Sequence, residues 1–301
     1  MSIDPLARSE RATQDRVAQV ATDLLASGSL ETSPERAGDA HELAALLPAG
    51  TRVYVTHLPR HALAQSHAAL KALRAAGLEP VAHIAARRLA SRDELASFLE
   101  RAAGEAGLSK VLALGGDEPR PLGPYADAAA MLREEFFVRH GIREVGLAGF
   151  PEGHPRVPRA QMEQALAQKL AIAADQGLGA YVVTQFSFAP GRVVEYCGEL
   201  ARAFPAAPVY VGLAGPTDTR TLLRFAQRCG VSASLRGLRA QGLGAVRLVT
   251  RTDPREQLAV IARYCLGRPA CNVVGAHLFS FGGTRKTAAW VNRQITSGAG
   301  S

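Results

Sequence analysis

The sequence predicts a single domain with the (β/α)8 barrel fold. Eight short runs of apolar and β-branched residues recur along the chain, separated by stretches of Ala, Leu and Arg with helical periodicity. Most side chains that could do chemistry come at or just after the C-terminal ends of these runs. In a closed parallel barrel those ends meet at one mouth, where enzymes of this fold carry their active sites.

Most spacings between the runs suit one strand, one helix and two loops. We expect residues 1–28 to form an N-terminal helical extension, residues 29–295 the barrel, and the small, polar residues 296–301 a flexible tail. Glycines interrupt the segment 232–268, in which residues 245–250 have the composition of a short strand. In chain order, the predicted strands are residues 29–32, 52–57, 80–85, 110–115, 144–149, 180–186, 208–213 and 272–279.

Length and composition agree with this fold and argue against other classes. The 301 residues are 47% hydrophobic and 21% charged, as in ordinary globular proteins, and barrels commonly reach this length as one unit. The Gly-x-Gly-x-x-Gly motif of a dinucleotide-binding sheet follows neither of the first two strands. No apolar run approaches the roughly 20 residues of a membrane helix, and the charged N-terminus has no signal core. We therefore expect a cytoplasmic protein without membrane binding.

Charge and cysteine spacing limit the classes of ligand and metal that the protein is expected to bind. The net charge is +8, but the arginines are scattered among alanine-rich helices and no aromatic-plus-basic motif accompanies them. This pattern is typical of solvated helix faces, so we expect no nucleic-acid binding, while the basic balance favours a small anionic substrate. The four cysteines lack the spacing of a zinc or iron–sulfur site, so we expect reduced thiols and no metal.

Three of the predicted strands carry candidate site residues. Glu31 ends the first strand, where partial burial would favour its protonated form and make it a general acid, although an exposed loop glutamate is the commoner outcome. His83 lies between apolar neighbours, which is also typical of a satisfied core histidine. Gly115-Gly116-Asp117 ends the fourth strand and either lets the backbone approach a ligand or forms a tight turn whose aspartate caps a helix.

Two further segments follow the fifth and sixth strands. Prolines and glycines around Glu152 and His154 predict a rigid, non-helical loop, which lowers the ordering cost of binding a ligand; the alternative is a structural strand-to-helix turn. Gln185 follows the sixth strand with an amide that can donate and accept at once. That amide matches the edge of a heterocycle such as a pterin or nicotinamide, or it belongs to an internal polar network.

Together these motifs resemble the methylenetetrahydrofolate reductase family over residues 30–231. The resemblance implies a flavin-binding barrel, an oxidoreductase that interconverts 5,10-methylenetetrahydrofolate and 5-methyltetrahydrofolate by hydride transfer through FAD. NAD(P)H or another electron carrier would be the second redox partner, and a homo-oligomer is compatible with the sequence. The matching elements are Glu31-Thr32-Ser33-Pro34, Val55-Thr56, residues 80–83, Gly116-Asp117, and the loop 151–155 with Thr184-Gln185-Phe186.

The same resemblance implies a role for each candidate residue. Glu31 would be the general acid that assists opening of the imidazolidine ring, and Asp117 would tune the electrostatics of the flavin and pterin. Gln185 and Phe186 would contact the folate substrate. The residues implied for FAD binding are Thr56, His83, Gly116, Asp117, Tyr125, Ala126, Phe150, Glu152, His154 and Lys169.

The chain also departs from the family pattern. Gly115 stands where the family usually has arginine, Phe150 where it has tyrosine, and Ala189 where an acidic residue is common. Leu222 or Leu223 lies where the family has an aromatic residue that stacks on nicotinamide or folate. Two alternatives therefore stay open: a non-catalytic folate- or flavin-binding protein, and a flavin-free pterin-binding barrel such as a methyltransferase.

Overall fold

Eight parallel strands close into a barrel in chain order, with β1 hydrogen-bonded to both β2 and β8. The computed structural model describes residues 5–59, 61–229, 231 and 254–298. The predicted short strand at 245–250 lies outside these residues. The strands are β1 (Ser29–Thr32), β2 (Arg52–Val55), β3 (Glu79–Ala85), β4 (Lys110–Leu114), β5 (Glu144–Gly149), β6 (Gly179–Thr184), β7 (Val209–Ala214) and β8 (Val273–Phe279).

The (β/α)8 fold and all eight strand positions predicted from the sequence are confirmed. The largest differences are at the C-terminal ends of β2 and β6, which stop at Val55 and Thr184, two residues earlier than predicted. There the chain leaves the sheet to build the loops of the mouth, at Thr56-His57 and Gln185-Phe186. The residues just past these ends face the region where a site would form.

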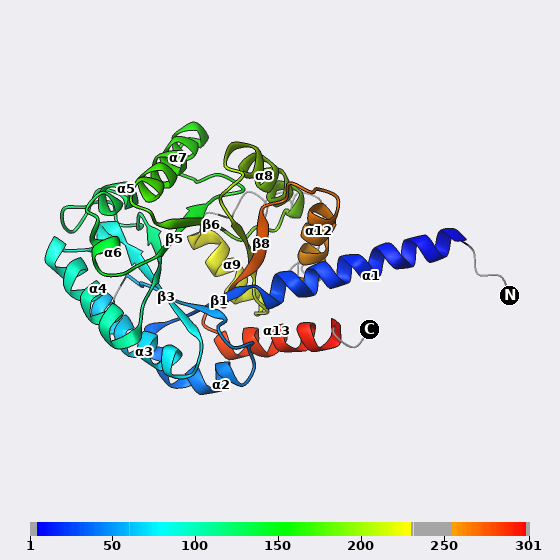
Figure 1. Ribbon diagram of the computed structural model, residues 1–301, viewed down its shortest axis with the longest axis horizontal. Coiled ribbons are helices and arrows are strands. Elements are labelled where there is room, and N and C mark those ends of the chain that lie inside the picture. Colours follow the sequence, from blue (N-terminus) through cyan, green and yellow to red (C-terminus); the bar gives the residue numbers. More distant parts are fainter. Residues whose placement is uncertain (1–4, 60, 230, 232–253, 299–301) are drawn as a thin grey trace.

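Helices surround the barrel as an outer ring (Figure 1). Local signals fix several of them: the Ser91 side chain accepts from the Glu94 N–H at the start of α4, and Gly107 ends that helix with φ +56°. The helical elements are α1 (Pro5–Ala26), η1 (Pro34–Asp39), α2 (Ala40–Ala44), η2 (Leu63–Ser66), α3 (His67–Ala75), η3 (Ala86–Arg88), α4 (Arg92–Ala106), α5 (Ala128–Leu132), α6 (Phe136–Arg139), α7 (Arg159–Asp175), α8 (Pro190–Ala203), α9 (Thr219–Arg228), α12 (Pro254–Leu266) and α13 (Thr284–Gly298).

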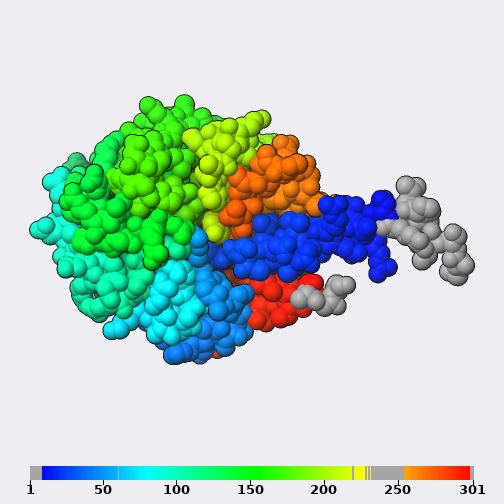
Figure 2. All heavy atoms as spheres, in the orientation of Figure 1, coloured from blue at the N-terminus to red at the C-terminus, as the bar shows by residue number. Residues whose placement is uncertain are grey.

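The N-terminal helix α1 packs against α12, α13 and β8 through its C-terminal half, where Val17, Leu24 and Leu25 are buried. Its first turns stand out from the body of the molecule (Figure 2). At the other end of the chain, residues 296–298 belong to α13, so the predicted flexible tail begins too early at residue 296. Helical hydrogen bonding there outweighs the low helix propensity of Thr296 and Ser297, whose hydroxyls also donate to α13 carbonyls.

The barrel interior is filled rather than hollow. Tyr54, Tyr181 and Tyr210 lie inside it, and the Tyr54 hydroxyl donates to that of Tyr181 at 3.0 Å. Below them, at the N-terminal ends of the strands, the Arg52 guanidinium lies 5.1 and 5.2 Å from the Tyr181 and Tyr210 rings and pairs with Glu144 at 2.9 Å. This layer closes one end of the barrel, so a ligand can enter only from the opposite mouth.

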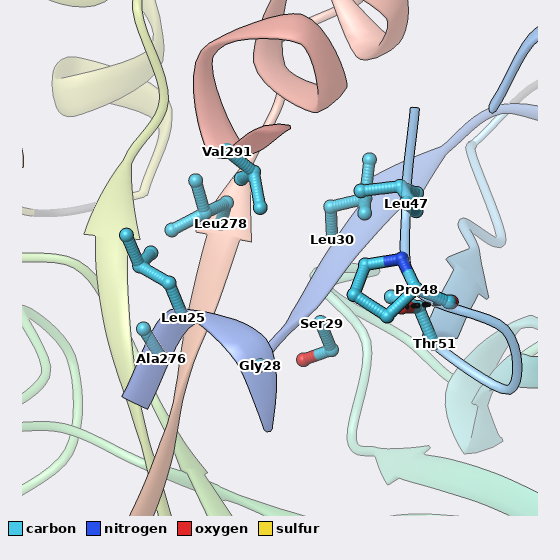
Figure 3. A pocket seen from close by; sticks show the side chains of 10 residues that line it. All are labelled: Leu25, Gly28, Ser29, Leu30, Leu47, Pro48, Thr51, Ala276, Leu278 and Val291. Atoms are coloured by element: carbon cyan, nitrogen blue, oxygen red, sulfur yellow. Dashed lines mark hydrogen bonds between the residues drawn. The ribbon is translucent and has the colours of Figure 1, made fainter. Parts of the chain in front are cut away.

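A small cavity lies outside the barrel wall, among the C-terminal end of α1, β1, β8 and α13 (Figure 3). Leu25, Leu30, Leu278 and Val291 make most of its lining apolar. Its volume of about 10 Å³ is roughly what one ordered water needs, so it is a packing defect rather than a site. Within the described part of the chain, no helix combines the length and apolar character needed to cross a membrane.

Candidate functional site

Glu31 lies at the mouth of the barrel between two histidines from neighbouring parts of the wall. Its Oε1 is 3.5 Å from Nε2 of His277 on β8 and 3.8 Å from Nε2 of His83 on β3. The Glu31 side chain keeps 17% of its surface exposed, whereas both histidines are buried. Ser29, two residues before Glu31 on the same strand, shares a 2.8 Å hydrogen bond with Nδ1 of His277. The strands thus hold one accessible carboxyl group against buried imidazoles.

The buried ring of Tyr54 packs against both histidines of this cluster. The Tyr54 ring meets the His277 ring edge-on at 4.6 Å and the His83 ring at 5.6 Å between centroids. Sequence reasoning missed His277 as a site residue. Strand alternation could have identified it, because His277 lies two residues before Phe279 in β8 and its side chain therefore points into the barrel.

Burial lowers the pKa of His83 to about 4, and the nearby His277 and His57 act in the same direction against Glu31. His83 is therefore neutral at neutral pH, and its contact with Glu31 is not a charged pair. Nε2 of His83 and Nε2 of His277 are both buried without a hydrogen-bond partner among the described residues. A buried ring nitrogen without a partner costs stability, and both atoms lie beside Oε1 of Glu31 without forming a hydrogen bond to it.

The histidines make stability depend on pH. The pKa of His57 is also lowered to about 4 by burial and by Arg88, so between pH 6.5 and 4 the unfolded chain binds more protons than the folded one. Stability is then complete above pH 6.5 and falls with pH by up to about 1.4 kcal/mol per unit for each histidine. We expect a lower urea midpoint at pH 5.0 than at pH 7.5, and a smaller difference in His83→Gln. Equal midpoints in the wild type would contradict this account.

The loops after β2, β3 and β4 are tied together beside this cluster. His57 accepts a hydrogen bond at Nδ1 from the Ala85 N–H at 3.2 Å, and Arg88 donates to the carbonyl of His57. Arg88 also pairs with Glu118 at 2.6 Å. Thr56, the predicted cofactor contact in this region, donates from Oγ1 to the carbonyl of Thr32 at 3.1 Å. These bonds make the floor of the mouth rigid.

Arg87 holds the long loop after β4. Its backbone N–H donates to the Gly115 carbonyl at 2.9 Å, and its guanidinium donates to the carbonyls of Glu118, Pro119 and Ala126 at 2.7–2.8 Å. Tyr125, next to Ala126, is 1% exposed. Its hydroxyl is buried without a hydrogen-bond partner among the described residues. Tyr125 and Ala126 therefore anchor the loop beside the mouth.

Asp117 lies on the rim of the mouth and not inside it. Its side chain is 80% exposed, and its Oδ1 is 3.6 Å from a guanidinium nitrogen of Arg156 in the loop after β5. Gly116, just before it, has φ +94°, a conformation that the chain needs for this turn and that a side chain would strain. An exposed pair of this kind contributes little to stability, so the Asp117 carboxylate can exchange partners readily.

The loop after β5 is ordered, as its prolines and glycines predict. Phe150 and His154 pack edge-to-face with centroids 5.5 Å apart, and His154 Nδ1 accepts from the Arg156 N–H at 3.2 Å. Burial lowers the pKa of His154, helped by Arg156. Glu152 is half-buried in the same loop. The structure thus places Asp117, Phe150 and His154 on one side of the mouth.

Gln185 and Phe186, which follow β6, differ in their exposure. The Gln185 side chain is half-buried and its Oε1 accepts from the N–H of Phe186 at 3.0 Å, while its own N–H donates to the Gly149 carbonyl. Phe186 is 1% exposed and packs against Phe188 and Phe279 with centroids 5.8 and 5.2 Å apart. Phe186 therefore shapes the wall behind Gln185.

An aromatic cluster that sequence reasoning missed lines the β6–β8 side of the mouth. Phe225 on α9 packs against Phe281 with centroids 4.8 Å apart at a tilt of 35°, and Phe281 stacks on Phe279 at 6.3 Å and 22°. Phe281 adopts φ +49°, a strained conformation for this residue type. Leu222 is buried in this cluster and Leu223 packs against it. Phe225 and Phe281 thus form an aromatic surface beside Leu222 and Leu223.

Lys169 lies in the helical layer rather than at a strand end. It belongs to α7, which packs against α5, β5 and β6. Burial lowers the pKa of Lys169, against an opposing effect of Asp127 at the N-terminus of α5. Of the residues implied for FAD binding, Lys169 has the least direct relation to the mouth. Among the described residues, no group of three or more His, Cys, Asp or Glu side chains is arranged to hold a metal.

Comparison with solved structures bears on the fold. A Clostridium thermocellum protein described as binding two copies of 5-methyl-5,6,7,8-tetrahydrofolic acid superimposes with a TM-score of 0.60 at 12% identity, covering 90% of this chain and 96% of that one. Tryptophan synthase α-subunit from Pyrococcus furiosus (TM-score 0.49, 12% identity, coverage 92% and 98%) and Xanthomonas albilineans dihydropteroate synthase (0.47, 12%, 90% and 92%) are less similar and carry no argument. At this identity the first similarity supports the barrel fold alone.

Comparison with protein families is more specific. The family model of methylenetetrahydrofolate reductase matches residues 40–234, well over half of the chain. This range includes the loops after β2 to β6 with Thr56, His83, Asp117, His154 and Gln185, whereas Glu31 and His277 lie outside it. The chain belongs to the methylenetetrahydrofolate reductase family.

Proposed function

We propose that this protein is a flavin-dependent oxidoreductase that interconverts 5,10-methylenetetrahydrofolate and 5-methyltetrahydrofolate, with NAD(P)H or another carrier as the electron partner. The observation that carries the proposal is the accessible Glu31 carboxyl group, held at the mouth against the buried His83 and His277. Family membership supports the substrate class. The Clostridium thermocellum protein, which shares the fold, is described as binding 5-methyltetrahydrofolic acid.

The residues of the mouth fit FAD. The buried, unpartnered Nε2 of His83 needs a polar partner that the described residues do not supply, and a flavin edge offers both donors and acceptors. When bound, FAD would supply hydride transfer between the electron carrier and the folate. The side chains and backbone proposed to hold it belong to Thr56, His83, Gly116, Asp117, Tyr125, Ala126, Phe150, Glu152 and His154, with Lys169 behind them in α7.

Glu31 would act on the folate by moving a proton. Opening of the imidazolidine ring needs a proton on one folate nitrogen while positive charge develops at the other. Neutral His83 lies on one side of the carboxyl group, and Ser29 orients His277 on the other side. Asp117, loosely paired with Arg156 on the rim, would supply the negative charge that stabilises the developing cation.

Gln185 and the aromatic cluster would position the substrate. The Gln185 amide lies at the end of β6, held by the backbone bond to Gly149, and would bind the pterin edge. Phe225 and Phe281 would offer the flat apolar surface for nicotinamide or folate that is missing at Leu222 and Leu223. Such stacking orients a planar ring and adds about 0.5–1.5 kcal/mol beyond area burial.

The missing arginine at Gly115 does not block this function. A Cβ at position 115 would meet no atom within 4 Å, so the space is open on that side of the loop. Arg87 fixes the backbone there through the Gly115 carbonyl. The positions of Gly116 and Asp117 thus do not depend on a side chain at residue 115.

A flavin-binding titration tests the proposal. We expect the wild-type chain to bind FAD, and His83→Gln to bind it at least about tenfold more weakly because one buried hydrogen bond is lost. His67→Gln is the matched control, since His67 lies on α3 at the outside of the barrel and pairs with Glu105. Absence of FAD binding by the wild type, or equal affinity in His83→Gln, would contradict the assignment.

A flavin-free folate-binding barrel, such as a methyltransferase, is the second candidate. Two observations favour it: glycine replaces the family's arginine at position 115, and Asp117 lies on the exposed rim. Binding of 5-methyltetrahydrofolate by a chain that does not bind FAD in the titration would favour this candidate over the first.

A further inference from the structure

Two cysteines meet at the end of the barrel opposite the mouth. Cys265 lies in the last turn of α12, and Cys271 lies two residues before β8 begins. A tight turn joins them, with the Arg268 N–H donating to the Cys265 carbonyl at 3.2 Å and the Cys271 N–H donating to the Arg268 carbonyl at 3.0 Å. This turn brings the two sulfur atoms to 2.9 Å from each other.

The two thiols are chemically unequal. The two thiols share one hydrogen bond, and this contact with Cys265, with help from the Val273 backbone and the charge of Arg268, lowers the pKa of Cys271 to about 7. The same contact, together with burial, raises the pKa of Cys265. Since the thiolate is the reactive form, Cys271 is the thiol that reacts first. Cys265 is then placed to attack the oxidised sulfur of Cys271. Both are only partly buried.

The other two cysteines provide an internal contrast. Cys197 on α8 is 1% exposed, and burial raises its pKa to about 12, which makes it inert. Cys229 follows α9, close to the aromatic cluster of the mouth. The pair is thus defined by the short turn between α12 and β8.

We propose that Cys265 and Cys271 are a reactive dithiol that hydroperoxides convert to an intramolecular disulfide. The Cys271 thiolate attacks the terminal peroxide oxygen, and the O–O bond breaks. When the oxidant is hydrogen peroxide, the leaving group is hydroxide, which takes up a proton to become water. The Cys265 sulfur then attacks the resulting sulfenic acid at Cys271, forming the S–S bond and releasing a second water. The dithiol loses two electrons and two protons, and the peroxide is reduced to two waters.

The disulfide would join the end of α12 directly to the start of β8. Because α12 packs against α1 and α8, the bond would restrain a large part of the helical layer near the N-terminal ends of the strands. The Glu31 cluster lies at the other end of β8, roughly 20 Å along a strand of this length. Oxidation would therefore leave the mouth residues in place.

Mass spectrometry of the full-length protein tests the proposal. The reduced protein is treated with one equivalent of hydrogen peroxide, denatured and alkylated. We expect a mass 2 Da below the reduced form before alkylation, two alkylated cysteines instead of four, and a peptide linking Cys265 with Cys271. Dithiothreitol should restore four reactive thiols. The pair should be oxidised at least about tenfold faster than Cys197.

Two variants complete the test. Cys265→Ser should stop at a sulfenic acid on Cys271 that dimedone traps, because the second thiol is absent. Cys229→Ser is the matched control and should form the disulfide like the wild type. Four alkylated cysteines in the peroxide-treated wild type, or a disulfide involving Cys197 or Cys229, would overturn the proposal. These measurements use no flavin or folate, so their outcome is independent of the proposed function.

Discussion

Glu31→Gln is expected to slow the folate half-reaction by about two orders of magnitude or more, because a positioned general acid contributes roughly 10²- to 10⁴-fold to proton transfer. Glutamine keeps the size and hydrogen-bonding atoms of the side chain but cannot donate a proton of comparable acidity. Reduction of the flavin by a nicotinamide donor needs no proton from this group, so its rate should change only a few-fold. Rapid mixing of each half-reaction under anaerobic conditions measures the two effects separately.

A matched control variant distinguishes the loss of the Glu31 proton donor from a general effect of removing a carboxylate. Glu35→Gln changes an exposed glutamate in η1 four residues further along, which pairs with His61 and has no role in the proposed reaction. Both half-reactions should proceed in Glu35→Gln as in the wild type. If Glu31→Gln slowed both half-reactions equally, Glu31 would be needed for binding or folding and not for proton transfer.

Gly212→Ala is expected to have the largest effect on stability. Gly212 lies in β7, where an added Cβ would sit 2.1 Å from the Thr184 carbonyl oxygen and 2.8 Å from the Phe279 ring. The backbone atom cannot move without separating β6 from β7, and the Gly212 N–H bond to Thr184 Oγ1 would be strained as well. Such overpacking costs about 1–3 kcal/mol, a fall in Tm of roughly 2–5 °C for a chain of this length. Thermal unfolding followed by circular dichroism measures the change.

Gly104→Ala serves as the control for this experiment and should have the opposite sign. Gly104 lies on the exposed face of α4, where an added Cβ meets no atom within 4 Å. Alanine there should stabilise the helix by up to about 1 kcal/mol. A Gly212→Ala protein as stable as the wild type would show that the β6–β7 contact is looser than the structure indicates.

The barrel was predictable because its signals are local and repeated. Most strands are short apolar runs, most of them followed by a loop that contains glycine or proline, and eight repeats in order leave few other topologies. The ends of β2 and β6 were predicted less well, because Thr56 and Phe186 are residue types that favour strands but belong to the loops of the mouth. Residues 296–298 show the same limit, since helical hydrogen bonding continues α13 through polar residues.

The site was predictable in its positions but not in its contacts. Glu31, His83 and the loop around His154 come directly after or within strands, so the topology alone brings them to one end of the barrel. The pairing of Asp117 with Arg156 depends on two loops whose conformations no local pattern encodes. His277 meets Glu31 only because β8 pairs with β1, a contact across 246 positions of sequence.

The most direct test of the central claim is an anaerobic visible spectrum of the FAD-loaded protein before and after addition of 5-methyltetrahydrofolate. Oxidation of the folate must transfer two electrons to the flavin, so the account predicts that the flavin absorbance band bleaches. The Glu31→Gln protein should bleach at least about a hundredfold more slowly. A loaded protein whose flavin band does not change with 5-methyltetrahydrofolate, although the folate binds, would contradict the proposed redox function.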